Sequence, residues 1–135
     1  MRVLIDTNVI ISAMIFKSSN MIDILLHVTE QHELCIAAYS IEEAKRILKD
    51  KFSSANGDID RFFMDYPYTL IDPVPDSGAP LAKIRDEKDY PVLYAAITGQ
   101  IDVLVTGDND FFEVKVDRPE IVHPQDYLLR YKQGC

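Results

Sequence analysis

The chain has 135 residues, and its 22 Asp and Glu against 14 Lys and Arg give a formal net charge of −8. This balance excludes a basic surface that wraps nucleic acid, while 47% hydrophobic and 27% charged residues exclude a disordered chain. The apolar run from Val9 to Phe16 is too short for a membrane span or signal peptide. Cys35 and Cys135 lack disulfide or zinc spacing. We therefore expect one soluble, cytoplasmic domain over residues 1–135.

The N-terminal part of the chain predicts two buried strands separated by a helix. Apolar residues follow one another without alternation over Arg2–Ile5, as in a parallel strand buried on both faces. Helical spacing of apolar residues begins after Ser18, which with its neighbours offers an N-cap, and continues to Val28. The second strand is predicted over Leu34–Ala38.

The middle of the chain predicts two further helices and a third strand. An amphipathic helix opens at Ser40, with apolar and charged residues on opposite faces. Small polar residues over Ser53–Asp58 indicate a loop, which is followed by a helix over Ile59–Tyr66 and a strand over Tyr68–Ile71. The proline-rich segment Asp72–Pro80 is typical of a surface connection within one domain.

The C-terminal part continues the alternation of helices and strands. A helix over Pro91–Ile97 ends at Gly99, and strands are predicted over Asp102–Thr106 and Glu120–Val122. A last helix is expected over Pro124–Tyr131. Short branched strands that alternate with helices predict a layered α/β fold around a parallel sheet.

Acidic side chains follow the predicted strands, at the edge where open α/β sheets bind their ligands. Asp6 ends the first strand, Glu43 lies in the first turn of the helix after the second, and Asp89 precedes a later helix. Asp108 and Asp110 follow the fourth strand. Carboxylates in one site raise each other's pKa values unless a cation neutralises them, so the pattern predicts a divalent ion. Oxygen ligands favour Mg²⁺ or Mn²⁺ and, with them, a phosphate ester as substrate.

Other cofactor sites are not expected from the sequence. His27 and His32 are five residues apart and so lie on different faces of a helix, which makes them a poor metal pair. There is no P-loop and no Gly-x-Gly-x-x-Gly after the first strand, so a nucleotide cofactor is not expected.

Four motifs, in this order, resemble those of a PIN domain over essentially the whole chain. They are Asp6-Thr7-Asn8, Ile41-Glu42-Glu43-Ala44 before Ile47-Leu48, Arg85-Asp86-Glu87-Lys88-Asp89, and Val105-Thr106-Gly107-Asp108-Asn109-Asp110. The type it resembles is the small prokaryotic kind proposed as toxins of toxin–antitoxin pairs. The resemblance implies a three-layer α/β/α PIN-like fold with a central parallel sheet of about five strands.

The resemblance also implies a metal-dependent endoribonuclease, in which a metal-activated water attacks an RNA phosphodiester with one or two Mg²⁺ or Mn²⁺ ions bound. By position in the motifs, the resemblance implies five metal-binding carboxylates: Asp6, Glu43, Asp89, Asp108 and Asp110. The first four of these would also be the catalytic residues. The hydroxyl of Thr7 and the amide of Asn8 would support the first acid or a metal-bound water.

Partners follow from charge and from the same resemblance. Lys45, Arg46 and Lys49 form a basic run that would steer RNA towards the protein, although such a run is also typical of a solvated helix face. The acidic surface suits a cationic antitoxin segment, and the resemblance implies a homodimer. No membrane is expected as a partner.

Each acidic residue also has a structural interpretation. Asp6 would cap a turn, and Glu43 would form a capping box with Ser40. Asp89 would be the N-cap of the next helix, while Asp108 and Asp110 would close a turn. Neighbouring acids are alternatives for two of the metal ligands. Glu42 is the alternative to Glu43, and Asp86 and Glu87 are the alternatives to Asp89.

Two other classes of protein fit the pattern less well. A non-catalytic PIN-like binding or regulatory module would not need all four acids. A Mg²⁺-dependent phosphatase of the aspartyl-phosphate type would carry a second Asp where Asn8 stands, and a receiver domain would carry Lys where His123 stands. The sequence therefore favours the nuclease.

Overall fold

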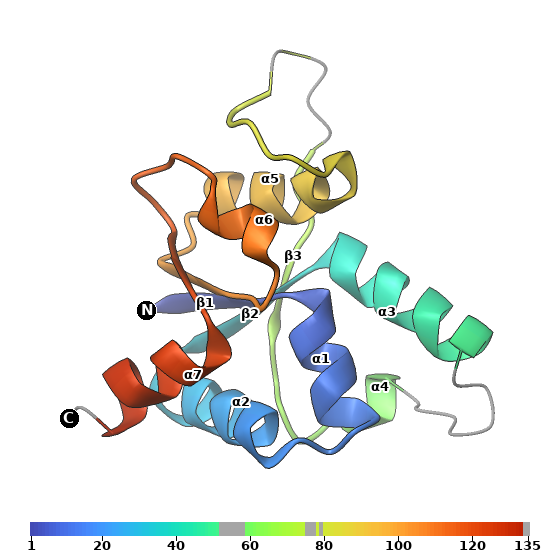
Figure 1. Cartoon of the computed structure of the whole chain (residues 1–135). Helices are drawn as coiled ribbons and strands as arrows, with labels where there is room; N and C mark the ends of the chain where they lie inside the picture. The colour runs from blue at the N-terminus through green and yellow to red at the C-terminus, as the bar shows by residue number, and fades with distance from the viewer. Residues whose placement is uncertain (52–58, 75–77, 79, 134–135) are drawn as a thin grey trace.

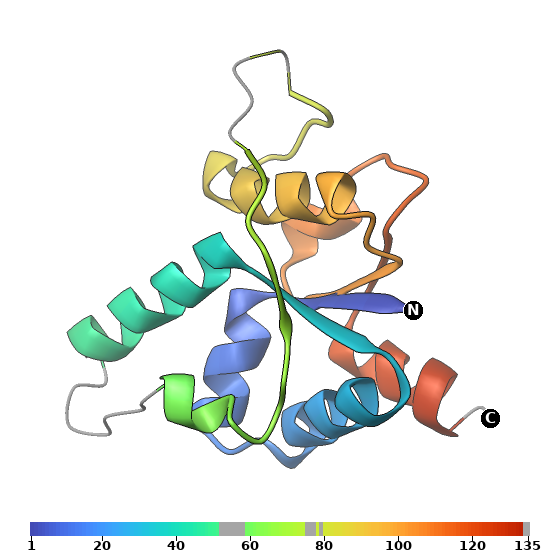
Figure 2. The ribbon, with the colours of Figure 1, turned by 180° about the vertical axis from the view of Figure 1, so that it is seen from behind.

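The structure, a computed structural model of the whole chain, describes residues 1–51, 59–74, 78 and 80–133 (Figure 1). The loop predicted over Ser53–Asp58 lies outside these residues, and so do parts of the predicted connection Asp72–Pro80. Figure 2 shows the same ribbon from behind.

The described residues form one parallel sheet of five strands in the order β3-β2-β1-β4-β5. The strands are β1 (Arg2–Ile5), β2 (Glu33–Ala37), β3 (Thr69–Ile71), β4 (Val103–Val105) and β5 (Glu120–Val122). At the centre, Val3 of β1 lies between Leu34 of β2 and Val103 of β4. Every strand was predicted to within one residue at each end. For the three central strands this is because continuous apolar runs mark strands that are covered on both faces.

Seven α-helices in the described residues connect and cover the strands. They are α1 (Thr7–Met14), α2 (Ser19–Gln31), α3 (Ala38–Lys51), α4 (Ile59–Phe62), α5 (Tyr90–Thr98), α6 (Asn109–Phe112) and α7 (Pro124–Tyr127). A short 3₁₀ turn, η1 (Glu87–Asp89), precedes α5, and a π-helical segment, η2 (Leu128–Gln133), follows α7.

The two faces of the sheet are covered by different helices (Figures 1 and 2). Successive side chains of a strand point to opposite faces. Val3 and Ile5 of β1 accordingly pack in one cluster with residues of α1, α2 and α7, whereas Leu4 packs in another with Leu93 of α5 and Phe111 of α6. This arrangement confirms the predicted three-layer α/β/α fold.

Helix boundaries differ from the sequence prediction at several places. The structure places helix α1 in the first apolar run, where we expected no helix, because Val9, Ile10 and Ile11 are all buried and leave no polar face to give a periodic pattern. The helix predicted from Ser40 begins two residues earlier, at Ala38. The helices predicted over 59–66 and 124–131 both end early as α-helices, and α6 was not predicted.

In the described part of the chain, no helix alone has the length and apolar character that a membrane crossing requires. Helices α1 and α2 satisfy that test only when they are taken together, and the pair is bent by 114°. Three apolar residues of α2 are buried in the core: Ile24, Leu25 and Val28.

Candidate active site

Asp6 lies where β1 ends and α1 begins, with 6% of its surface exposed. Its backbone N–H donates to the carbonyl of Val105, which fixes the end of β1 against β4. One carboxyl oxygen accepts a hydrogen bond from the backbone N–H of Thr7 at 2.8 Å, and the other accepts from the hydroxyl of Thr106 at 2.8 Å. Asp6 therefore caps α1, as its structural interpretation proposed, and is held rigidly while it does so.

Thr106 connects Asp6 to the loop that carries Asp108. Its hydroxyl donates to Asp6 and accepts from the backbone N–H of Asp108 at 3.0 Å, and its own N–H donates to the carbonyl of Val122. Thr106 is fully buried. The sequence predicts no separate role for Thr106 within its motif, although its position at the end of a buried strand is a signal that singles it out.

Thr106→Val is expected to destabilise the fold by about 1 to 3 kcal/mol, because a buried carboxyl loses a donor and the N–H of Asp108 loses its acceptor. Urea denaturation would measure the loss. Thr106→Ser keeps the hydroxyl and should recover most of it. Equal stability of the valine variant and the wild type would show that this hydroxyl does not hold Asp6.

Asp108 caps α6 by accepting a hydrogen bond from the backbone N–H of Asp110 at 2.9 Å, so its turn interpretation is correct in part. Asp110 lies 3.9 Å from the guanidinium of Arg85, whose side chain is largely exposed. Such an exposed pair contributes little to stability. Asp108 and Asp110 both lie near Asp89, which stands at the start of α5.

Asp89 follows η1 and stands at the N-cap position of α5, yet its side chain makes no capping hydrogen bond. One of its oxygens, Oδ2, is buried and has no hydrogen-bond partner among the described residues. Asp89 therefore occupies the predicted N-cap position, but its carboxyl does not cap the helix. Asp86 instead caps η1, by accepting from the N–H of Lys88 at 3.0 Å.

Three of these carboxyl groups come close enough together to share one cation. A ligand oxygen from each of Asp86, Asp89 and Asp110 lies within 4.8 Å of the other two. Asp86 had been only an alternative to Asp89, but the η1 turn places both at one point. The geometry thus adds Asp86 to the residues that could hold a metal.

The pKa values of two carboxyls show how the acids interact. The pKa of Asp6 is raised to about 6, mainly by burial and also by the charges of Glu43 and Asp108, although the hydrogen bonds from Thr106 and Thr7 act to lower it. The pKa of Asp89 is raised to about 7, mainly by burial and also by Asp108, Asp86 and Asp6. The acids predicted after three different strands therefore lie in one electrostatic cluster.

Glu43 joins this cluster from α3. Ser40 is the third residue of α3, and its buried hydroxyl has no hydrogen-bond partner among the described residues, so the predicted capping box with Glu43 is wrong. Glu42 is exposed whereas Glu43 is half-buried, which agrees with the helix phase that favoured Glu43. The charge of Glu43 acts directly on Asp6.

Thr7 and Asn8 were predicted to support the first acid or a metal-bound water, and their role toward such a water stays a prediction. Thr7 contributes its backbone N–H to Asp6, while its hydroxyl is buried and has no partner in the described structure. Asn8 is exposed in the first turn of α1. The hydroxyl that does hold Asp6 belongs to Thr106.

The basic run and the histidines lie outside the acidic cluster. Lys45, Arg46 and Lys49 are all exposed on α3. The rings of His27 and His32 are 5.5 Å apart, so the prediction that they lie on different helix faces was wrong. The reason is that α2 ends at Gln31, and His32 turns back in extended conformation.

A sequence model of the PIN domain matches residues 2–110, which include every acidic residue of the cluster. The chain belongs to the PIN domain family. One similar solved structure is that of VapBC2 from Rickettsia felis bound to a DNA fragment from their promoter. That match has a TM-score of 0.67 and 16% identity and covers 91% of this chain and 98% of that chain, so it shows the fold alone. No curated protein sequence gives a significant match.

Proposed function

We propose that this PIN domain is a metal-dependent endoribonuclease whose acidic cluster holds one or two Mg²⁺ or Mn²⁺ ions. The observation that carries the proposal is that the buried Oδ2 of Asp89 lies among other carboxyls and has no hydrogen-bond partner in the described part of the chain. A buried carboxyl oxygen that accepts no hydrogen bond is unfavourable unless a cation binds it or a proton neutralises it. Its neighbours are also acids, and this environment favours a cation.

The residues present fit such an ion. All the candidate ligands are carboxylate oxygens, which suit hard divalent cations better than zinc. We assign four of them as catalytic residues, namely Asp6, Glu43, Asp89 and Asp108. Asp110 and Asp86 are assigned as additional ligands. Thr106 and the N–H of Thr7 keep Asp6 oriented, so the site is ordered before any ligand binds.

A bound divalent cation would lower the pKa of the attacking water and stabilise negative charge on the phosphodiester. The protein's own contribution is to hold the carboxyl groups of the cluster in fixed orientations. The N–H of Asp110 does this for Asp108, and Thr106 does it for Asp6. No nucleophilic side chain is needed for this reaction.

RNA would approach along α3, where Lys45, Arg46 and Lys49 offer exposed positive charge beside Glu43. These contacts would steer the substrate weakly, because the chain as a whole carries a net charge of −8.

We further propose that the protein acts in the cytoplasm as the toxin of a toxin–antitoxin pair and forms a homodimer. Support comes from the similar fold in the VapBC2 structure. The cationic antitoxin segment would cover the acidic cluster, with an Arg or Lys among the carboxylates. A non-catalytic PIN-like module, by contrast, would not explain why Oδ2 of Asp89 is buried among carboxyls without a partner in the described residues.

Incubation of the purified protein with mixed-sequence single-stranded RNA, in Mn²⁺ or in chelator, tests the function. We expect cleavage only with the metal, and none with Asp6→Asn. Asp65→Asn is the matched control, since Asp65 is exposed and precedes β3 at the opposite edge of the sheet. Equal cleavage by the wild type and Asp6→Asn would reveal a contaminating nuclease. No cleavage by either, despite metal binding seen by calorimetry, would favour the non-catalytic module.

A further inference from the structure

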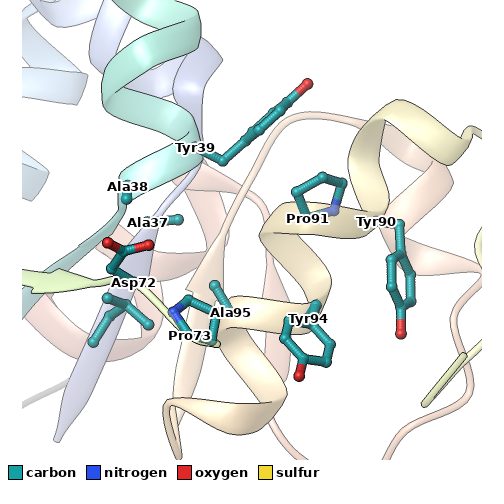
Figure 3. Close-up of a pocket in the computed structure, with 10 residues that line it drawn as sticks. Ala37, Ala38, Tyr39, Asp72, Pro73, Tyr90, Pro91, Tyr94 and Ala95 are labelled. Carbon is teal, nitrogen blue, oxygen red and sulfur yellow. The ribbon is translucent and has the colours of Figure 1, made fainter. Parts of the chain in front are cut away.

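A pocket of about 320 Å³ opens between the ends of β2 and β3 and helix α5 (Figure 3). Its size is at the lower end of the range for small-ligand sites, so it suits one compact group. We call it the tyrosine pocket, after the rings among its main lining residues, which are Tyr39, Asp72, Pro73, Tyr90, Pro91 and Tyr94.

The tyrosine pocket adjoins the acidic cluster on two sides. Tyr39 lies one helical turn before Glu43 on α3, and Tyr90 directly follows Asp89. The charges of Glu43 and Asp89 add to burial in raising the pKa of the Tyr39 hydroxyl, which places all three groups near one another. A polymer that is cleaved at the acids would therefore have its neighbouring unit beside this pocket.

Two of the three rings are held in place by the backbone, whereas the hydroxyl of Tyr39 hydrogen-bonds the side chain of Arg46 on the same helix. The hydroxyl of Tyr90 accepts from the N–H of Leu81 at 3.0 Å, and the hydroxyl of Tyr94 donates to the carbonyl of Val74 at 3.0 Å. The two ring centroids are 6.0 Å apart. In Figure 3, Tyr39 projects from the start of α3, and its ring extends away from Asp72 and from Tyr94. Ordered flat faces of this kind suit stacking against a planar group.

Charge decides between a base and a phosphate as the occupant. Asp72 is the only charged residue that lines the pocket in the described structure, and Figure 3 shows its carboxyl beside Ala37 and Ala38. A carboxylate disfavours an anion but accepts hydrogen bonds from N–H groups. A planar, uncharged group with N–H donors matches both the rings and Asp72.

We propose that the tyrosine pocket binds the nucleobase next to the scissile phosphate, with Asp72 accepting hydrogen bonds from its N–H groups. The inference rests on the proposed ribonuclease function and adds a base preference to it. Guanine presents two adjacent N–H donors on its Watson–Crick edge, whereas uracil presents one between two acceptors. The pocket therefore selects guanine over uracil beside the cut.

The first test maps the cut in a single-stranded RNA and then replaces each flanking nucleotide in turn by guanine, uracil or an abasic residue. We expect the wild type to prefer guanine on one side of the cut. In Tyr39→Ala the ratio of rates between intact and abasic RNA should fall about tenfold, whereas Tyr39→Phe keeps the ring and most of the ratio. Asp72→Asn should remove the preference for guanine over uracil.

Tyr66→Ala is the matched control, because Tyr66 is also half-buried but precedes β3 at the opposite edge of the sheet. It should leave the base preference as in the wild type. Metal-dependent cleavage with no base effect on either side of the cut would overturn the tyrosine pocket as a base site and leave the nuclease intact.

A second measurement does not depend on cleavage. Guanosine monophosphate and ribose 5-phosphate are titrated into the metal-free protein, and the tyrosine ring signals are followed by NMR. Shifts with the nucleotide alone, lost in Tyr39→Ala, would support the base site even if no RNA is cut. If neither compound binds and Tyr39→Ala instead abolishes self-association in sedimentation, the pocket belongs to a second copy of the chain and the proposal is wrong.

Discussion

Asp89→Asn is expected to slow metal-dependent RNA cleavage by roughly a thousandfold, since a metal's stabilisation of the reacting phosphodiester is worth several kcal/mol. Asparagine has nearly the same shape as aspartate but offers one neutral acceptor in place of two charged ones. The buried Oδ2 of Asp89, which has no partner in the described residues, is the atom we expect the cation to contact. Single-turnover cleavage rates at fixed Mn²⁺ would measure the effect.

The stability of the same variant separates a lost ligand from a damaged fold. Burial and the charges of Asp108, Asp86 and Asp6 all raise the pKa of Asp89 in the metal-free protein. The neutral amide removes that repulsion, so the Tm of Asp89→Asn in chelator at pH 7.5 should equal or exceed that of the wild type. Added Mn²⁺ should raise the Tm of the wild type only.

Asp65→Asn again serves as the control and should change neither rate nor Tm response. Cleavage by Asp89→Asn within about tenfold of the wild type would contradict its assignment as a ligand. A large fall in Tm would instead assign Asp89 a structural role.

The parts of the site that the sequence predicted are those that depend on topology alone. Parallel strands place their carboxyl ends at one edge, so acids after the first and fourth strands had to meet there. Asp6 and Asp108 do so, and Glu43 follows from the phase of an amphipathic helix. The strand positions themselves came from unbroken apolar runs, which also explains why α1, apolar on most sides, was not recognised as a helix.

The parts that were missed depend on which strands are neighbours and on single turns. Thr106 reaches Asp6 only because β4 pairs with β1, and a sequence does not state that pairing. Asp86 joins Asp89 because a 3₁₀ turn separates them. The tyrosine pocket, likewise, exists only once α5 packs beside β2 and β3, so Tyr39 and Tyr94 gave no sign of a shared site.

The metal-free protein is expected to lose stability as the pH rises from about 4 to above 6. Asp6 has a pKa of about 6 in the folded protein, against 3.8 for an aspartate in the unfolded chain. A carboxyl whose pKa is raised by folding binds its proton more tightly in the folded state, so stability falls with pH between the two values. A shift of this size corresponds to about 3 kcal/mol of unfolding free energy, present below pH 4 and lost above pH 6.

Urea denaturation in chelator at several pH values would measure this change, with Asp6→Asn as the reference because it cannot titrate at that position. The difference in unfolding free energy between the wild type and the variant should move by about 2.5 kcal/mol against the wild type from pH 4 to pH 7. Groups that do not interact with Asp6 cancel in this difference, whereas Asp89, whose pKa the charge of Asp6 raises, adds to it. A difference that stays constant with pH would mean that Asp6 is charged at its ordinary pKa in the folded protein.

Divalent metal should reverse the same loss. At pH 7 Asp6 is ionised, which lowers the free energy of unfolding. A cation that binds only the folded protein raises this free energy again, in proportion to the logarithm of the cation concentration. Mn²⁺ should therefore stabilise the wild type more at pH 7 than at pH 5, where protons compete for the carboxyls. Asp6→Asn should show a much smaller gain at both. A metal effect that is equal at the two pH values, or unchanged in the variant, would place the cation away from Asp6.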